Sequence, residues 1–311
     1  MLGMCFIMNN SYDCIVVGGG IAGLQASIQL GRYNHNVLVI DSNDGRSTIC
    51  RSYHNILGYP DGVSGETLRS LGKSHAAKYG VNFINDRVTD ASKNNSLFTL
   101  KCESGGTYRA EKILLATGVM DRIPDIPNIF PCLGISIYVC PDCDGYEVKD
   151  KSVIVLGAGA TGANLALTLS YWTSKITYIN HDGHDIDENV KVKLGKKGIR
   201  YLKEGIKEVL TGEEPSEFKG VKLNNGENVE GDRAFIAFSG NEVRTDLATQ
   251  LGVERLENKH LNINFRTKET NVLNVWAAGD ILPHSEQVTI AMGDGIQAAI
   301  WMHKSIINDC H

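Results

Sequence analysis

The amino-acid sequence predicts an α/β fold that contains two similar strand–turn–helix units. In each unit a short apolar, strand-like run leads into a Gly-x-Gly-x-x-Gly turn, and apolar residues at helical spacing follow the turn. The two turns, 18–23 and 157–162, lie in the first and second halves of the chain. With 311 residues, the chain is long enough for two domains of ordinary size.

The first unit has the pattern of a dinucleotide-binding turn. Gly18 permits the tight turn, Gly20 lets the backbone approach a pyrophosphate, and Gly23 lets the helix pack closely against the strand. The next apolar strand, 36–40, ends at Asp41, whose carboxylate is placed to accept hydrogen bonds from a ribose. No basic residue stands at this position, so we do not expect a 2′-phosphate here.

The second unit repeats this pattern but lacks a residue that would select its nucleotide. Asn180 occupies the position of Asp41, because each lies 18 residues after the last glycine of its turn. Sites for NADH normally present a carboxylate at this position, and sites for NADPH normally present arginines. The residues 181–184, which follow Asn180, contain no arginine. The candidate residues of this second nucleotide-like site are Gly157, Gly159, Gly162 and Asn180.

Composition and charge disfavour several other functions. The net charge is −5 and the isoelectric point is near 6.0, so without a basic face we expect no nucleic-acid partner. The lysine-rich stretch 191–197 has apolar residues at helical spacing and is interpreted as a solvated helix face. No apolar run approaches the roughly 20 residues that span a bilayer, and the segment 1–8 lacks the basic start of a signal peptide. We therefore expect a cytoplasmic protein.

Cys140 and Cys143 form a Cys-x-x-Cys pair between the two glycine turns. Two cysteines at this spacing can close a small disulfide ring, and the first thiol often has a lowered pKa that makes thiolate available for attack on another disulfide. The alternative is a zinc site completed by His181 and His184. Cytoplasmic cysteines are expected to rest reduced, so either role suits the pair better than a structural disulfide. The other cysteines lack this spacing and are interpreted as passive thiols: Cys5, Cys14, Cys50, Cys102, Cys132 and Cys310.

A third signature lies near the C-terminus, where an apolar strand runs into Gly279-Asp280 and a helix opens after Gln287. Together with Thr117-Gly118, the first glycine turn and the Cys-Pro-Asp-Cys-Asp-Gly segment, it resembles the low-molecular-weight thioredoxin reductases. The resemblance covers residues 12–307 and implies two Rossmann-like dinucleotide-binding domains, the second inserted into the first. The implied domains are an FAD-binding domain of residues 1–120 and 245–311 and an inserted domain of residues 121–244, which carries the cysteine pair.

The resemblance implies FAD as the cofactor and no metal. In this family the aspartate of the Gly-Asp pair holds the ribityl chain, which falls on Asp280, and the helix start at Gln287 and Val288 approaches the edge of the isoalloxazine ring. His284 falls in the same region, where we expect either a flavin contact or a packing role. The other residues expected at the cofactor are Gly18, Gly20, Gly23, Asp41, Arg46, His54, Asn55, Thr117, Gly118 and Gly279.

The resemblance also implies a role for each residue around the cysteine pair. Cys143 faces the flavin and exchanges a pair of electrons with it, whereas Cys140 attacks a partner disulfide and forms a mixed disulfide that Cys143 resolves. Asp144 is the candidate for proton transfer to the leaving thiolate, because burial beside an apolar ring can raise the pKa of a carboxyl group. The alternative for Asp144 is a structural role in the turn before Gly145.

The sequence departs from the family at the residues that determine the expected electron donor. Members that use NADPH carry a His-Arg-Arg stretch where this chain has Asn180, His181 and Asp182, and the segment 54–62 replaces the usual flavin-facing loop. The pattern is closer to flavin disulfide reductases that use ferredoxin or another donor, and to dithiol oxidases. We expect a homodimer that passes electrons from a ferredoxin-like donor to a thioredoxin-like protein or a small disulfide. The alternatives are a flavin dithiol oxidase with oxygen as acceptor, an NADPH-dependent thioredoxin reductase with an atypical site, and a redox-sensing flavoprotein without turnover.

Overall fold

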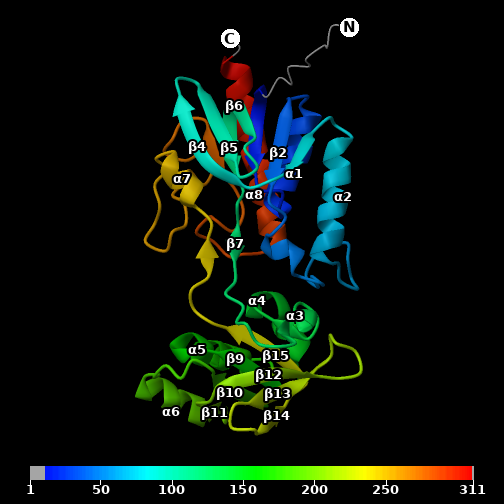
Figure 1. The fold of residues 1–311 in the computed structure, drawn as a ribbon, viewed down its shortest axis with the longest axis vertical. Coiled ribbons are helices and arrows are strands. Elements are labelled where there is room, and N and C mark those ends of the chain that lie inside the picture. Colours follow the sequence, from blue (N-terminus) through cyan, green and yellow to red (C-terminus); the bar gives the residue numbers. More distant parts are fainter. Residues whose placement is uncertain (1–10, 310–311) are drawn as a thin grey trace. The chain divides into compact units, whose positions relative to one another are not determined.

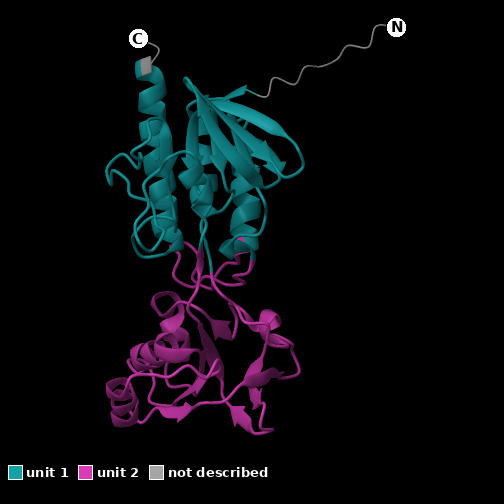
Figure 2. Cartoon of the chain, turned by 60° about the vertical axis from the view of Figure 1, so that its left-hand side comes forward, with its two compact units in different colours: residues 1–48, 66–120, 243–311 teal, residues 49–65, 121–242 magenta. Residues whose placement is uncertain are grey.

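A computed structural model of the protein describes residues 11–309, which divide into two compact units (Figure 2). Unit 1 combines residues up to 48, residues 66–120 and residues from 243 onward, whereas unit 2 combines residues 49–65 and 121–242. An inserted domain produces this kind of division. Two segments differ from the predicted boundaries: residues 49–65, expected in the first domain, belong with unit 2, and residues 243–244, expected in the inserted domain, belong with unit 1. The expectations for the segment 1–8, Cys5 and Cys310 lie outside the described residues.

Unit 1 is built on a seven-stranded mixed sheet (Figure 1). Its strands are β1 (Ser11–Val17), β2 (Val37–Asp41), β3 (Asn82–Asn85), β4 (Val88–Asn94), β5 (Leu97–Cys102), β6 (Thr107–Leu115) and β17 (Val275–Ala277). They run in the order β3-β2-β1-β6-β5-β4, and β17 pairs with the second half of β6. The pairs from β3 to β6 and the β6–β17 pair are parallel, whereas β4, β5 and β6 pair antiparallel. The carboxyl ends of β1 and β2 therefore meet at one edge of the sheet, where the first glycine turn begins.

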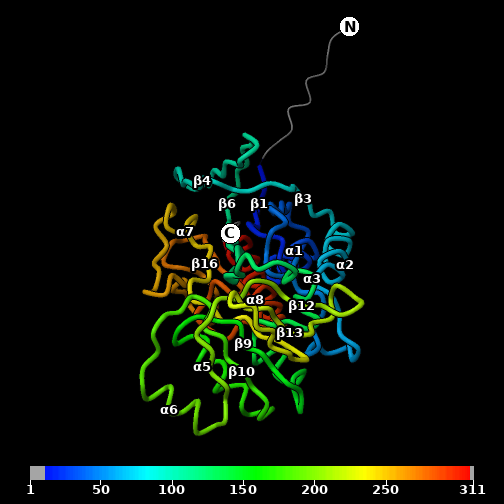
Figure 3. Tube along the Cα trace, turned by 60° about the horizontal axis from the view of Figure 1, so that its bottom comes forward, coloured from blue at the N-terminus to red at the C-terminus, as the bar shows by residue number. Residues whose placement is uncertain are grey.

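Helices and alternating apolar residues bury both faces of this sheet. The helices of unit 1 are α1 (Ile21–Arg32), α2 (Gly65–Ala77), α7 (Asp246–Gln250), α8 (Val288–Asp309) and the 3-10 turn η1 (Arg46–Thr48). In β1, Cys14 and Val16 pack with α1 and α8, whereas Ile15 and Val17 pack on the opposite face with apolar residues of β4 and β5. Because α1 and α8 pack together, the early and late parts of the chain lie side by side in unit 1 (Figures 1 and 3).

Unit 2 has three layers. Its strands are β8 (Ile137–Tyr138), β9 (Val153–Gly157), β10 (Ile176–Asn180), β11 (Arg200–Leu202), β12 (Ile206–Thr211), β13 (Phe218–Leu223), β14 (Asn228–Glu230) and β15 (Arg233–Ala237). Its helices are α3 (Ile129–Cys132), α4 (Pro141–Asp144), α5 (Gly159–Leu169), α6 (Glu188–Lys196) and the 3-10 turn η2 (Gly145–Val148). A parallel sheet in the order β11-β10-β9-β15-β8 is the middle layer. Val153 and Val155 of β9 pack against α5 on one face, and Ile154 and Leu156 pack against the antiparallel sheet β12-β13-β14 on the other.

Two chain segments join the units, and their short strands β7 (Val119–Met120) and β16 (Glu242–Val243) pair with each other. At the unit 1 end, the Thr117 hydroxyl donates to the Arg244 carbonyl and the Arg244 backbone N–H donates to the Gly118 carbonyl at 3.1 Å. The side chain of Thr117, predicted at the cofactor, thus fastens one connecting segment to the other. Within residues 11–309, no helix is both long and apolar enough to cross a membrane.

Candidate functional site

The first glycine turn joins β1 to α1 and leaves room beside the start of the helix. Gly18 has a left-handed φ of 103°, and a Cβ on it would overlap the Ala116 carbonyl. A Cβ on Gly23 would overlap the Gly18 carbonyl, so the helix packs directly on the turn. A Cβ on Gly20, by contrast, would meet no atom within 4 Å. Because Gly20 caps α1 without a side-chain hydrogen bond, this space adjoins backbone N–H groups that suit a pyrophosphate.

Asp41 ends β2 and is buried beside this turn. One carboxylate oxygen accepts from the Gly19 backbone N–H at 3.0 Å, and the other accepts from the Arg69 guanidinium at 2.6 Å. Arg69 is buried as well, and it also donates to the Gly19 carbonyl at 3.0 Å and to Asn43 Oδ1 at 2.6 Å. Asp41, predicted as a ribose contact, therefore also holds the turn in shape together with Arg69. Sequence reasoning missed Arg69, because a single arginine within α2 carries no signal of this contact.

Two predicted cofactor residues, Arg46 and Asp280, meet in unit 1. The Arg46 guanidinium donates to Asp280 at 3.0 Å and to Glu286 at 2.6 Å, and all three side chains are partly exposed. Asp280 follows Gly279 directly after β17, and Glu286 lies in the loop before α8. The arrangement fixes the Gly-Asp segment next to the start of α8, where Gln287 and the buried Val288 lie.

His284 lies in the same loop and belongs to a cluster of charged side chains from separate segments. Its Nε2 lies 2.6 Å from Asp294, whose other oxygen lies 2.7 Å from the Lys268 ammonium. Asp294 also accepts from the Gly279 backbone N–H at 3.2 Å. The hydrogen bond to Asp294 raises the pKa of His284. Burial tends to raise the pKa of Asp294, but the bonds from His284 and Lys268 hold that pKa below its ordinary value. These contacts give His284 a charge-pairing role, and its expected flavin contact stays a prediction.

In unit 2, Cys140 and Cys143 form the disulfide that their spacing predicted. Pro141 starts the short helix α4, and Cys140 caps it, so that the Cys143 backbone N–H points at the Cys140 sulfur at 3.2 Å. Immediately after α4, a Cβ on Gly145 would lie 2.6 Å from the Trp172 ring. This contact requires glycine and packs the segment that follows the disulfide onto the end of α5.

Asp144 lies next to the disulfide and has a strongly shifted pKa. Burial, followed by the negative charge of Glu147, raises the pKa of Asp144 to about 7. His54 lies 3.9 Å from both Asp144 and Glu147, measured from its Nδ1 to a carboxylate oxygen of each. The prediction placed His54 and Asn55 at the flavin; the structure places their loop in unit 2 and His54 beside the two carboxyl groups.

The second glycine turn, between β9 and α5, is closed by neighbouring side chains. Asn180 is fully buried, and its Oδ1 accepts from the Gly159 backbone N–H at 2.9 Å. Its amide nitrogen donates to the His184 carbonyl at 2.5 Å and to the Tyr201 hydroxyl at 3.1 Å. A Cβ on Gly159 would lie 3.3 Å from the His184 Cβ. Every polar hydrogen and the oxygen of the Asn180 side chain are thus engaged by the protein.

The other groups around this turn are also engaged by the protein. His181 accepts from the Ile206 backbone N–H at 2.9 Å through Nδ1. Arg122 follows the first connecting segment in the chain. Its guanidinium lies 3.4 Å from the Asp182 carboxylate and stacks over the Phe238 ring. A zinc site on the cysteine pair and these histidines has no counterpart here, because the two cysteines are joined to each other and, among residues 11–309, no group of three or more candidate ligands is arranged for a metal ion.

The remaining described cysteines are separate from the disulfide. Burial raises the pKa of Cys50 and Cys102 to about 11 and also raises the pKa of Cys14 and Cys132. A thiol with a raised pKa holds little thiolate at neutral pH and reacts slowly. These four cysteines match their interpretation as passive thiols.

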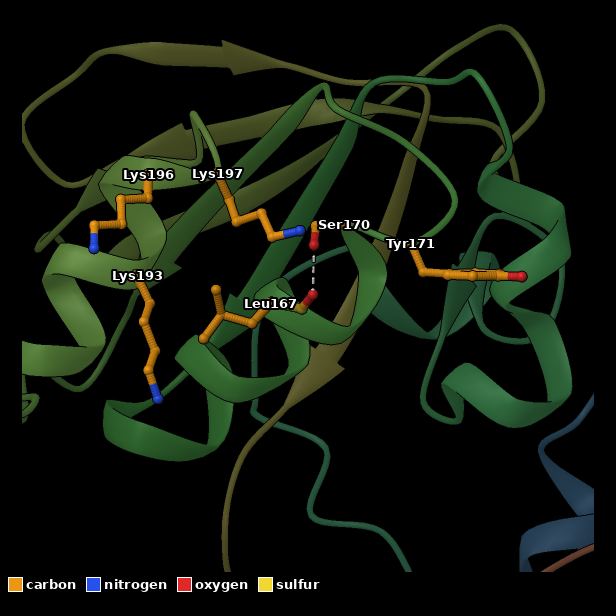
Figure 4. A pocket seen from close by; sticks show the side chains of 6 residues that line it. All are labelled: Leu167, Ser170, Tyr171, Lys193, Lys196 and Lys197. Atoms are coloured by element: carbon orange, nitrogen blue, oxygen red, sulfur yellow. Dashed lines mark hydrogen bonds between the residues drawn. The ribbon is translucent and has the colours of Figure 1, made fainter.

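A pocket of about 490 Å³ opens on the surface of unit 2 between the C-terminal ends of α5 and α6 (Figure 4). Its lining residues are Leu167, Ser170, Tyr171, Lys193, Lys196 and Lys197. Figure 4 shows Tyr171 pointing away from the three lysines. The lysines are exposed and end α6, where cations offset the partial negative charge of the helix terminus, as the prediction of a solvated helix face implies.

Comparison with known proteins gives a consistent result for the whole chain. The family described as "Pyridine nucleotide-disulphide oxidoreductase" matches residues 12–295. A "Probable thioredoxin reductase" of Arthroderma benhamiae is 29% identical over 94% of this chain and 80% of its own length. A "Thioredoxin reductase" of Coxiella burnetii is 28% identical over 93% of this chain and 94% of its own. The crystal structure of a putative thioredoxin reductase from Bacillus anthracis superimposes with a TM-score of 0.84 at 28% identity, covering 96% of this chain and 100% of that one.

Proposed function

Because this chain belongs to the pyridine nucleotide-disulphide oxidoreductase family, we propose that it passes electrons through FAD and the Cys140–Cys143 pair to the disulfide of a thioredoxin-like protein, with a donor other than NADPH. At the coarser level it is a thioredoxin reductase-like, FAD-dependent disulfide oxidoreductase, as its relatives are. The observation that carries the proposal is the Cys140–Cys143 disulfide with Asp144 beside it.

The residues of unit 1 fit an FAD. The space beside Gly20 and the uncapped start of α1 suit the pyrophosphate, and Asp280, held by Arg46 in the loop after β17, is the residue proposed to contact the ribityl hydroxyls. When bound, FAD supplies a carrier for a pair of electrons that the thiols can exchange. The residues proposed to hold it are Gly18, Gly20, Gly23, Asp41, Arg46, Thr117, Gly118, Gly279, Asp280, Gln287 and Val288.

Each cysteine has its own step. In the reduced pair, the Cys143 backbone N–H stabilises a thiolate on Cys140, which attacks one sulfur of the partner disulfide. A Cys140–partner bond forms, the partner disulfide breaks, and Asp144 donates a proton to the leaving thiolate. The Cys143 thiolate then attacks Cys140, which closes the internal disulfide and releases the second partner sulfur as a thiolate that takes a proton from solvent. The partner gains two electrons and the pair loses two.

The donor is inferred from the second glycine turn. Asn180 is buried and fully engaged, and the adjacent Arg122 pairs with Asp182, so unit 2 offers a 2′-phosphate no guanidinium at this position. Each missing phosphate–guanidinium contact is worth roughly 1.5 to 3 kcal/mol, so two of them weaken NADPH binding on the order of 100- to 10,000-fold. A ferredoxin-like protein or another reduced carrier is the proposed donor.

Thioredoxin reduction by cysteine variants tests the proposal. With chemically reduced protein, we expect wild type to reduce thioredoxin, Cys140→Ser to be inactive, and Cys143→Ser to accumulate a mixed disulfide with thioredoxin. Hydrogen peroxide formation from small dithiols without any thioredoxin reduction would instead identify a dithiol oxidase. We further propose a cytoplasmic homodimer, which sedimentation of the flavin-loaded protein and fractionation of cells would check.

A further inference from the structure

The loop 49–65 is built to hold His54 in unit 2. Tyr53 and Val63 exchange backbone hydrogen bonds at 2.8 and 3.1 Å, which closes the loop around His54. A Cβ on Gly62 would overlap the Ser52 hydroxyl and lie 3.0 Å from the His54 ring, so only glycine fits there. The loop begins at Ile49, which packs against the core of unit 2. The position of His54 is therefore set by the fold of unit 2.

His54 is more exposed to solvent than the neighbouring Asp144. Its side chain is 31% exposed, whereas that of Asp144 is 14% exposed. On its outer side, the His54 Nε2 lies 3.0 Å from the Ser52 hydroxyl; on its inner side, its Nδ1 lies 3.9 Å from Asp144 and from Glu147. A small rotation of either side chain, or one water, brings the imidazole and the Asp144 carboxyl into hydrogen-bond contact.

Charge in this cluster favours holding protons near the disulfide. The Glu147 carboxylate attracts a cationic imidazole at His54 and also disfavours ionisation of Asp144. The other ionisable groups here are Cys50 and Tyr138, whose pKa values burial raises to about 11 and about 12, and Arg233 of β15, which acts on Tyr138. Cys50 and Tyr138 therefore keep their protons at neutral pH, which leaves His54 as the neighbouring side chain whose ring nitrogen can pass a proton to Asp144.

We propose that His54 is a positioning residue that returns the proton to Asp144 after each disulfide exchange. This inference rests on the proposed roles of Cys140 and Asp144. When Cys140 attacks a disulfide, Asp144 gives its proton to the leaving thiolate; the His54 imidazolium then transfers its Nδ1 proton to Asp144 and recovers a proton from solvent. Charge and protons balance, and no electrons beyond those of the cysteine pair are involved.

The role of His54 is tested by comparing reaction rates with two disulfides whose leaving thiolates differ in their need for a proton. The flavin-loaded protein is kept reduced by excess reduced methyl viologen and mixed in a stopped-flow instrument with hydroxyethyl disulfide or with dipyridyl disulfide, and the rate of a blank without protein is subtracted. The alkyl thiolate is a poor leaving group that needs a proton, whereas the pyridine thiolate leaves without one. We expect His54→Gln to slow multiple-turnover reaction with the alkyl disulfide about tenfold or more, and the aromatic one by less than about twofold. His75→Gln, a matched change at an exposed histidine of α2, should alter neither rate.

A double variant separates a relay from a structural effect. If His54 acts through Asp144, then His54→Gln should slow an Asp144→Asn protein no further. Equal slowing of both disulfides by His54→Gln, or additive effects of the two substitutions, would overturn the inference while leaving the proposed function intact. A reduced protein that reacts with neither disulfide would instead overturn the proposed function, and the inference with it.

Discussion

The two glycine turns of this chain share a sequence pattern but differ in what surrounds the third position of the turn. Gly20 of the first turn has no atom within 4 Å of where a Cβ would lie, whereas Gly159 of the second faces the His184 Cβ at 3.3 Å. The residue that ends the following strand differs as well: Asp41 pairs with the buried Arg69, and Asn180 uses its amide on His184 and Tyr201.

The difference shows that glycine spacing specifies a fold and not a ligand. In both units the glycines let a helix pack tightly onto a strand, which is a requirement of the backbone. Whether a nucleotide can enter depends on neighbours such as His184 and Tyr201, which come from later segments of the chain. We propose that the second turn keeps this architecture without binding a nucleotide.

The largest expected effect comes from filling the space at Gly20. Its φ of −73° accepts a β-branched residue, so Gly20→Val should fold normally. The added methyl groups occupy the space proposed for the pyrophosphate, so we expect flavin affinity to fall by at least about 100-fold, or about 3 kcal/mol. The flavin-to-protein absorbance ratio of purified protein measures this.

The matched change is Gly159→Val. At its left-handed φ of 51°, a β-branched residue costs about 1 to 3 kcal/mol of stability, but flavin content should stay at the wild-type value. A Gly20→Val protein that purifies with full flavin would remove the proposed functional difference between the two turns.

A different effect, on stability and not on flavin affinity, is expected at the residues that end the two strands. Asp41→Asn leaves the buried Arg69 without its carboxylate and should lower the free energy of unfolding by about 3 to 5 kcal/mol. Asn180→Asp replaces an amide donor that faces the His184 carbonyl, and should cost about 1 to 3 kcal/mol. Chemical denaturation of both variants measures these costs. Faster flavin reduction by NADH in Asn180→Asp would show that the second turn still admits a nucleotide.

The pH dependence of stability distinguishes a carboxyl group of unit 2 from one of unit 1. Burial raises the pKa of Asp144 from 3.8 to about 7, so the folded state holds this proton more tightly than the unfolded state. The contribution of Asp144 to stability is therefore largest below about pH 4 and is lost progressively as the pH rises to about 7. In unit 1, Asp294 has a lowered pKa, and its contribution is instead lost as the pH falls through that value.

The Asp144→Asn substitution tests the direction in which stability changes with pH. The variant should gain stability relative to wild type as the pH rises from 4 to 7, and the difference should be constant above that range. Urea denaturation at a series of pH values, with His75→Gln as a control, measures the difference. A stability difference that does not change with pH would mean that Asp144 is ionised in the folded protein at pH 5.

The sequence predicted those features that depend on neighbours along the chain. The two strand–turn–helix units and the Cys140–Cys143 pairing follow from local patterns, whereas the raised pKa of Asp144 was expected from the resemblance to the family. Arg69 and Glu286 escaped prediction, because each meets its partner only through tertiary packing of separate segments. The family resemblance suggested a flavin contact or a packing role for His54, and its proximity to Asp144, which depends on the folding of a separate loop onto unit 2, was not predicted.

Flavin reduction by NADPH tests the central claim that the second turn has lost its nucleotide. The purified, flavin-loaded protein is mixed anaerobically with increasing NADPH, and bleaching of the flavin is followed by stopped flow, with NADH and a reduced ferredoxin in parallel. We expect slow bleaching by both nicotinamides, with a rate that rises in proportion to concentration, and fast bleaching by the protein donor. Rapid bleaching that saturates at micromolar NADPH would contradict the account, because it would require a formed 2′-phosphate site beside the buried Asn180.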